Sequence, residues 1–176
     1  FFLSEDTINC MTVLQRIIEK KGIPYAIYVD EAGCFGGGKR AHFNQFKRAC
    51  EELGIKIIFA TSAPAKGRIE RLWHTLQDRL IKELRLAHIS TINKANVFVE
   101  NIFIPKFNKQ FSVESRSKVN LHSVLTAREQ EQLTAICSRQ TQRTVQNDFT
   151  FSFNNRWFQL TKDQTATICK KDKVVV

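Results

Sequence analysis

Apolar side chains recur at helical spacing in three segments of the first half of the chain, and short continuous apolar runs separate these segments. The helical spacing predicts helices over residues 8–20, 42–53 and 66–86. The runs 25–29 and 55–59 are rich in Ile and aromatic residues, which favours buried strands. An order of helix, strand, helix, strand and long helix predicts an α/β fold.

A further helix is expected from Thr91, which can cap it, to Phe103, and Pro105 should close it. The polar stretch 114–122 follows and has no sustained period. Such a stretch predicts a linker. Residues 1–113 would then form the first domain.

Beyond this linker the pattern is that of a small β-rich domain over residues 123–176. A short helix is predicted for 127–138. Residues 149–153 alternate apolar and polar side chains, and an Asn-Asn pair separates them from 156–160. This pattern is typical of a β-hairpin, and the apolar end of the chain, 173–176, adds a last strand.

Composition predicts a globular protein without a membrane segment. The chain has 176 residues, 43% of them hydrophobic, which suffices for a packed core. No apolar run approaches the roughly 20 residues of a membrane helix, and no secretory leader is evident at the N-terminus. We therefore expect a cytoplasmic protein. Its five cysteines form no Cys-x-x-Cys pair, which predicts reduced thiols rather than disulfides or a zinc site.

The formal net charge of +10 predicts a polyanionic partner. If Lys and Arg neutralise phosphates, the affinity for such a partner should fall as salt rises. A basic surface that serves only solubility explains the charge alone about equally well.

Two acids follow the two predicted strands. Asp30 ends the first run, and Glu70 lies just inside the long helix that follows the second. Paired carboxylates at neighbouring strand and helix ends are what a divalent-metal phosphotransfer site requires. Each acid also has an ordinary interpretation, since Asp is common in turns and an acid in a first helical turn is favoured by the helix dipole.

The segments around these acids resemble the catalytic core of DDE transposases and integrases, in particular the integrase-core (rve-type) transposases of bacterial insertion sequences. The landmarks of the resemblance are Tyr28-Val29-Asp30, Phe46 to Ile55, Lys66-Gly67-Arg68-Ile69-Glu70-Arg71-Leu72 and Leu84-Arg85-Leu86. The resemblance covers most of the chain.

It implies an RNase H-like α/β fold followed by a small SH3-like barrel that binds DNA. Asp30 would be the second and Glu70 the third of three acids that hold Mg²⁺ or Mn²⁺. It further implies metal-dependent DNA cleavage and strand transfer in transposition, a homo-oligomer assembled on DNA, and a location at the bacterial nucleoid.

One feature departs from the family. Its first Asp lies on an opening strand, upstream of the segment that matches residues 1–5 here, and Asp6 does not replace it because it falls at the start of the next helix. The resemblance therefore implies an N-terminally truncated core that lacks its first strands and is inactive alone. The alternative is a catalytically dead remnant that only binds DNA.

A competing motif is the run Gly33 to Lys39, which fits the spacing G-x-x-x-x-G-K of a phosphate-binding loop. It follows a strand and precedes a helix, as such a loop should. Arg40 stands where Ser or Thr should hold Mg²⁺, and no second acidic strand is evident. A nucleotide-binding protein is therefore the third hypothesis.

Candidate DNA contacts lie in both domains. In the first domain the candidates are basic residues on the long helix. For those on the outer face of this helix, a solvated surface is an equally good explanation. In the second domain the candidates are basic residues that could form a DNA-binding surface together with Trp157. These candidates are Lys66, Arg68, Arg71, Lys82 and Arg85, and then Arg143, Arg156 and Lys171. His74 could assist near the cleft, although a lone His is more often structural, and Trp73 is expected in the core.

Overall fold

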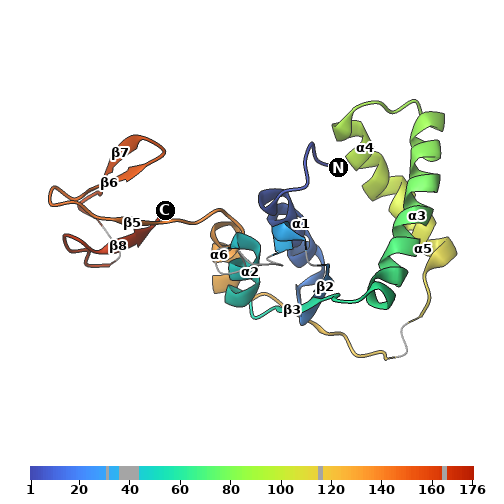
Figure 1. Ribbon diagram of the computed structural model, residues 1–176, viewed down its shortest axis with the longest axis horizontal. Helices are drawn as coiled ribbons and strands as arrows, with labels where there is room; N and C mark the ends of the chain where they lie inside the picture. The colour runs from blue at the N-terminus through green and yellow to red at the C-terminus, as the bar shows by residue number, and fades with distance from the viewer. Residues whose placement is uncertain (31, 36–43, 115–116, 164–165) are drawn as a thin grey trace. The chain divides into compact units, whose positions relative to one another are not determined.

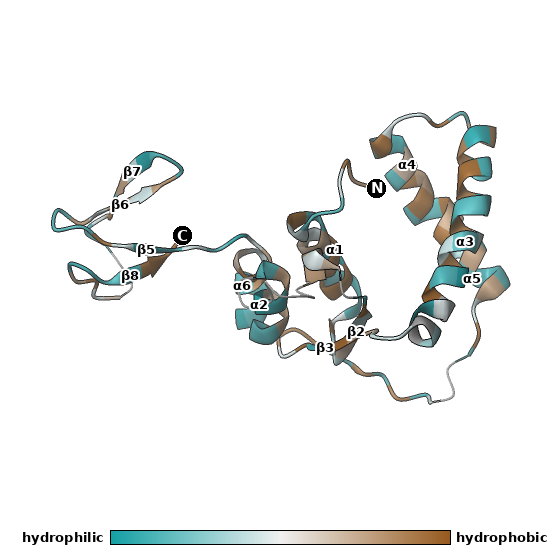
Figure 2. Cartoon of the chain, viewed as in Figure 1, coloured by the Kyte–Doolittle hydropathy of each residue, from teal (hydrophilic) through white to brown (hydrophobic). Residues whose placement is uncertain are grey.

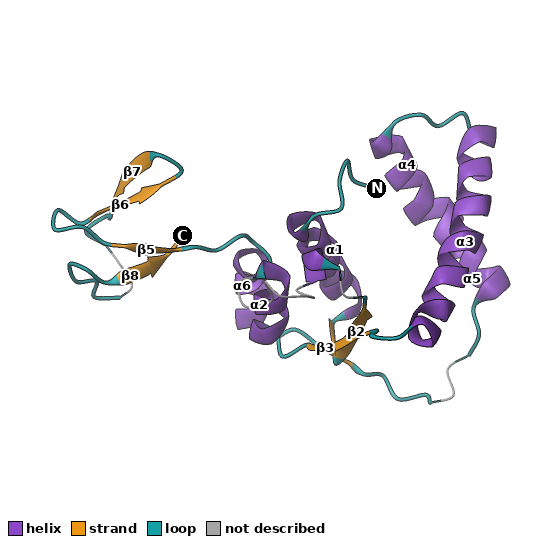
Figure 3. Ribbon diagram, in the orientation of Figure 1, coloured by secondary structure: helices purple, strands orange, loops and turns teal. Residues whose placement is uncertain are grey.

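The computed structural model divides the chain into two units, residues 1–137 and 138–176, and each is described by itself (Figures 1 and 3). The described residues are 1–30, 32–35, 44–114, 117–163 and 166–176. Within these ranges, none of the helices combines the length and the apolar composition that crossing a bilayer demands.

The first helix, α1 (Thr7–Lys21), begins one residue before the predicted start. Its cap is Asp6, whose carboxylate accepts a hydrogen bond of 2.8 Å from the Asn9 amide. An Asp at this position satisfies one of the first amides of the helix, which have no partner inside it. The helix ends at Gly22, where φ is +88°.

The two predicted strands pair in parallel. β2 (Ala26–Val29) and β3 (Lys56–Phe59) run from the pair Ala26 and Lys56 to the pair Val29 and Phe59. Helix α2 (Gln45–Glu52) lies between them in sequence, as expected for a parallel connection. Both strands therefore present their carboxyl ends at the same edge of the sheet.

The core of the first unit is formed by three helices and residues beside the strands. Ile27 and Ile57 of the sheet pack against it, and α6 (Ala127–Ile136) contributes its apolar side. The buried residues are Met11, Leu14, Ile18, Ile23, Phe46, Ala49, Cys50, Leu53, Ile55, Leu133, Ile136 and Cys137.

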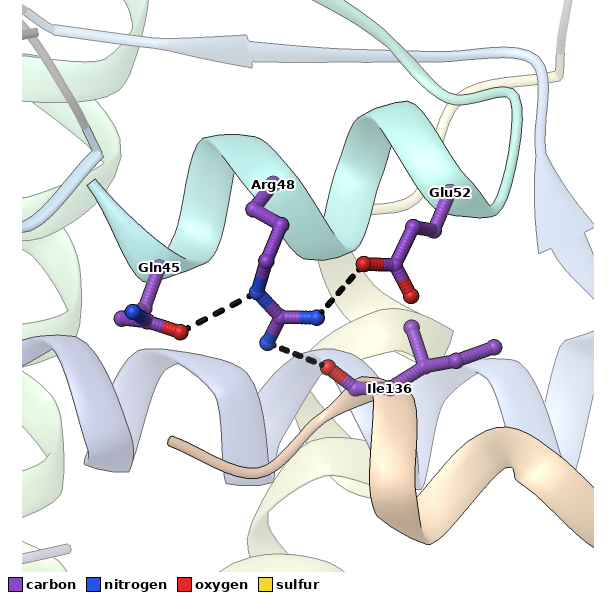
Figure 4. A network of polar contacts seen from close by, with 4 residues as sticks. All are labelled: Gln45, Arg48, Glu52 and Ile136. Atoms are coloured by element: carbon purple, nitrogen blue, oxygen red, sulfur yellow. Dashed lines mark hydrogen bonds and ion pairs between the residues drawn. The ribbon is translucent and has the colours of Figure 1, made fainter. Parts of the chain in front are cut away.

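Helix α6 is held against α2 by a polar network around Arg48 (Figure 4). Its guanidinium donates to the Ile136 carbonyl at 2.8 Å and also bonds Gln45 and Glu52. The segment before α6 is also joined to the first unit, because β4 (His122–Ser123) pairs with β1 (Ile23–Pro24). The second unit thus begins at Ser138, whereas the sequence predicted a domain start at residue 123 after a linker over 114–122. Leu133 and Ile136 explain the difference, because they are buried in the core of the first unit.

Three helical segments follow the long helix α3 (Ala63–Leu86): α4 (Ile92–Phe98), the π-helix η3 (Val99–Phe103) and α5 (Ile104–Phe111). Figure 2 shows hydrophobic and hydrophilic residues alternating around α3.

The sequence predicted that Pro105 closes the helix that begins after Thr91, and this prediction is wrong. Pro105 lies in the first turn of α5, where a missing N–H is tolerated, and the chain stays helical to Phe111. The wider π turn before it is a usual way to interrupt the regular hydrogen-bond pattern. Lys106 of α5 pairs with Glu83 of α3 at 2.6 Å.

The described part of the second unit contains two antiparallel strand pairs. The hairpin of β6 (Thr150–Phe153) and β7 (Arg156–Gln159) confirms the prediction from the alternating pattern. Asn154 and Asn155 both have positive φ, 50° and 59°, as a two-residue I′ turn requires. The other pair is β5 (Gln142–Thr144) with β8 (Lys173–Val175), and Val145 beside it is completely buried.

Candidate functional site

Asp30 and Glu70 follow the two parallel strands. Asp30 is the residue after β2, is exposed, and accepts a hydrogen bond of 3.1 Å from the Ala32 amide. The Ala60 amide donates to the Val29 carbonyl at 2.8 Å, so β3 ends level with β2. Helix α3 begins three residues later and carries Glu70 on its exposed surface. Asp30 and the start of α3 therefore belong to one edge of the sheet.

A groove of about 520 Å³ lies beside this edge. Its lining is mostly apolar and includes Val29, which precedes Asp30, and Trp73, which lies one helical turn after Glu70. Among the described residues, neither Asp30 nor Glu70 lines the groove itself. Each acid is thus close in sequence to a residue that lines the groove, Asp30 to Val29 and Glu70 to Trp73.

The donor set suits a hard divalent cation, but it is small. Carboxylate oxygens are the ligands that Mg²⁺ prefers, and Mn²⁺ accepts the same ligands. In the part of the chain that the structure describes, no group of three or more His, Cys, Asp or Glu side chains could hold a metal ion. Asp30 and Glu70 could at most contribute two carboxylates to one ion.

A further acid, Glu5, stands on the Asp30 side of the groove. It lines the groove, and its Oε1 lies 3.9 Å from the Sγ of Cys34. Burial raises the pKa of the Cys34 thiol, and the charges of Glu5 and Asp30 add to the rise. This side of the groove is therefore negative. Sequence reasoning missed Glu5, because it precedes α1 in a segment without periodicity.

All five cysteines are free, and among them Cys50 and Cys137 are buried while Cys169 is exposed. Burial raises the pKa of Cys10 and of Cys50 to about 12, and that of Cys137 to about 11. These thiols stay protonated at neutral pH, so they are poor nucleophiles and poor metal ligands.

The predicted cations of the first unit lie on α3. Lys66 is half-buried in the first turns, and Arg71 turns back to donate to the Gly67 carbonyl at 3.2 Å. The side chain of Arg68 lies outside the described part of the structure. Lys82 is paired with Asp78 at 2.5 Å, which favours its interpretation as part of a solvated helix face.

The cations predicted in the second unit lie near aromatic rings or in turns. The guanidinium of Arg143 lies 5.7 Å from the centre of the Phe153 ring. Arg156 is exposed and opens β7 directly after the hairpin turn. Lys171 has φ of +69°, and its amide donates to the Val145 carbonyl at 2.9 Å.

Trp73 is not a core residue. The sequence placed it on the apolar stripe of the long helix, but 59% of its surface is exposed, and Ile69 and Leu72 beside it are 40% and 46% exposed. The described core of the first unit is formed mainly by side chains of α1, α2 and α6. The apolar side chains in this part of α3 therefore do not pack in that core.

The phosphate-loop match falls mostly on residues 36–43, which lie outside the described residues. Its first residues, Gly33–Phe35, form the short 3₁₀ turn η1. The roles of Lys39 and Arg40 therefore remain predictions.

Comparison with known proteins finds relatives of this chain. The chain is 34% identical over 171 residues to y4bF, a protein of Sinorhizobium fredii named as a transposase, in an alignment that covers 94% of the chain and 37% of that protein. It is 32% identical over 186 residues to the transposase for insertion sequence IS1202 of Streptococcus pneumoniae, which covers 100% of the chain and 39% of that protein. The chain is similar to transposases. It spans less than two fifths of either relative, and no protein-family model matches it.

Proposed function

We propose that this chain carries part of the metal site of a DDE-type transposase, with Asp30 and Glu70 as two carboxylate ligands of Mg²⁺ or Mn²⁺. The whole protein would use this site to cut DNA and to join strands in transposition. The observation that supports the proposal most is the parallel pairing of β2 and β3, after which Asp30 and α3 leave the same edge of the sheet. The similarity to proteins named as transposases supports the same reaction class.

The chemistry follows from the donors. In two-metal sites, ions about 3.5–4 Å apart activate the attacking water or hydroxyl and stabilise the leaving oxygen. Asp30 and Glu70 would supply oxygen ligands, and Glu5 adds negative charge on the Asp30 side of the groove. Lys66, Arg68 and Arg71 would hold DNA phosphates at the start of α3.

We propose an RNase H-like arrangement for the first unit and an SH3-like one for the second. The strand–helix–strand unit with parallel strands is consistent with the former, and the small antiparallel sheets with the latter. Assembly of several copies on DNA belongs to the same proposal.

By itself the chain should not cut DNA, because the resemblance assigns only two of the three acids to positions of this sequence. A nicking assay on DNA with terminal repeats, with Mg²⁺ or Mn²⁺, should show negligible turnover. Robust turnover that Glu70→Gln abolishes would contradict this expectation.

A DNA-binding remnant without metal chemistry is the second candidate. The observation that favours it is the lack, among the described residues, of any group of three metal-ligating side chains. Both candidates predict DNA binding that weakens with salt. Only the first predicts that Asp30 and Glu70 bind Mn²⁺.

A further inference from the structure

A pocket in the second unit lies beside one face of the hairpin. It has a volume of about 550 Å³. Its lining joins one indole ring to polar side chains, from Gln146, Asn147, Asp148, Thr150 and Trp157. The register pairs Trp157 with Ser152, so both project from the face that also carries Thr150. The apolar alternation of the hairpin, Phe151, Phe153 and Phe158, belongs to the opposite face.

Trp157 is thus a large aromatic residue on the polar face of its hairpin. It is 66% exposed, while Phe158 on the opposite face stacks on Phe151 with the ring centres 5.5 Å apart. An indole this exposed adds little to packing. Its flat face remains available for stacking on another ring.

The rest of the lining offers hydrogen-bond groups. Asp148 Oδ1 accepts from the Thr150 hydroxyl at 2.7 Å and from the Thr150 amide at 3.2 Å, and these bonds lower the pKa of Asp148. Asp148 is therefore ionised at neutral pH, and its Oδ2, which accepts no hydrogen bond from a described residue, remains for a ligand. The side-chain amides of Gln146 and Asn147 bond no other described residue.

We propose that this pocket binds an unpaired nucleobase of DNA, stacked on Trp157, with an exocyclic amine of the base directed at Asp148. The inference rests on the proposed function, because it assumes that the basic second unit binds DNA. Residues 138–176 hold seven Lys and Arg against three Asp.

The chemistry limits which base fits. Inside a duplex, away from its ends, both faces of each base are covered by its neighbours, so there the indole can reach only a base that has left the stack. A carboxylate accepts a hydrogen bond from the exocyclic amine of cytosine, adenine or guanine. Thymine has no such amine and should bind less well.

The test compares the affinity of the full chain, without divalent metal, for a labelled duplex and for the same duplex with one unpaired cytosine. Stacking on Trp157 predicts tighter binding of the unpaired form by about fivefold or more, and a smaller gain with unpaired thymine. Trp157→Ala should abolish the preference, whereas Trp157→Phe should keep much of it. Phe158→Leu, on the opposite face, is the matched control and should keep the full preference.

The outcomes separate the two proposals. Equal affinity for both duplexes, or a preference that survives in Trp157→Ala, contradicts the base pocket and leaves DNA binding intact. Failure to bind either duplex contradicts both. If Trp157→Ala does not fold, the fluorescence of Trp157 in a Trp73→Phe background decides. It should be quenched more by the unpaired than by the paired duplex, and equal quenching would overturn the inference.

Discussion

At Gly22 two constraints meet in one residue. Its φ is +88°, a conformation that side chains with a Cβ rarely adopt, and a Cβ there would overlap the carbonyl oxygen of Ser123. Gly54 also has positive φ, +68°, but a Cβ there would meet no atom within 4 Å. Gly22 thus allows the close approach of β1 and β4, while Gly54 only ends α2.

The two glycines form a matched pair for mutagenesis. Gly54→Ala should lower the free energy of unfolding by about 1–2 kcal/mol, the cost of left-handed backbone alone. Gly22→Ala should cost clearly more, because the β1–β4 pair must also separate. Urea unfolding of both variants measures the difference, and equal losses would mean that the contact with Ser123 is not needed.

Some of the acids beside the groove could be proposed from the sequence, and others could not. Asp30 and Glu70 could be proposed because each follows an apolar run, and the strands before them do pair. Glu5 gave no such signal, and the exposure of Trp73 could not be foreseen, because spacing shows that a helix has an apolar side but not whether a core meets it.

Among the helices and strands, those with signals that act within a few residues could be predicted from the sequence. The Asn-Asn turn and the alternation beside it identified the hairpin, because both act within a few residues. The continuation of the helix past Pro105 could not be read in the same way. A proline in a first helical turn and a proline after a helix look alike in sequence, and the π turn of η3 decides between them.

The cap of α6 predicts a pH effect. Hydrogen bonds from the Thr126 amide and hydroxyl hold the pKa of Glu129 below its ordinary value. Because the folded pKa is the lower one, this stabilisation is complete above the unfolded pKa of about 4.3 and is lost as pH falls through the folded value. Glu129→Gln keeps a capping side chain that does not titrate. Its unfolding midpoint should fall less on acidification than that of the parent, and parallel curves would contradict the role of the cap.

The contact between α2 and α6 depends on Arg48. Arg48→Ala removes a charged donor from the Ile136 carbonyl and should lower the free energy of unfolding by about 1.5–3 kcal/mol. Arg48→Lys tests the forked geometry, because one ammonium cannot serve Gln45, Glu52 and Ile136 in the same way. Urea unfolding should rank the parent above Lys and Lys above Ala, and an Ala variant as stable as the parent would show that α6 is held by its apolar side alone.

At the scale of the whole molecule, the division of the chain depended on contacts that sequence patterns do not contain. The polar stretch 114–122 reads as a linker, yet β4 and α6 after it return to the first unit. A boundary drawn from polarity alone misses this, because Leu133 and Ile136 identify an amphipathic helix but not the surface that it covers.

This division is testable by truncation. Residues 1–137 should fold, with a cooperative thermal transition like that of the first unit in the full chain. Residues 1–122 should not fold, because this piece lacks Leu133, Ile136 and Cys137, which cover the core. Circular dichroism on both pieces gives the answer, and a cooperative transition for residues 1–122 would restore the boundary predicted from the sequence.

The proposed function depends most on Asp30 and Glu70 sharing a metal ion. The most direct measurement is Mn²⁺ binding to the full chain, followed by the loss of the free-ion signal in electron paramagnetic resonance. We expect one weak site per chain that both Asp30→Asn and Glu70→Gln remove. Asp78→Asn, which changes an exposed acid of the same helix that is paired with Lys82, should leave the site intact. Binding that survives in both Asp30→Asn and Glu70→Gln would contradict the proposed metal site.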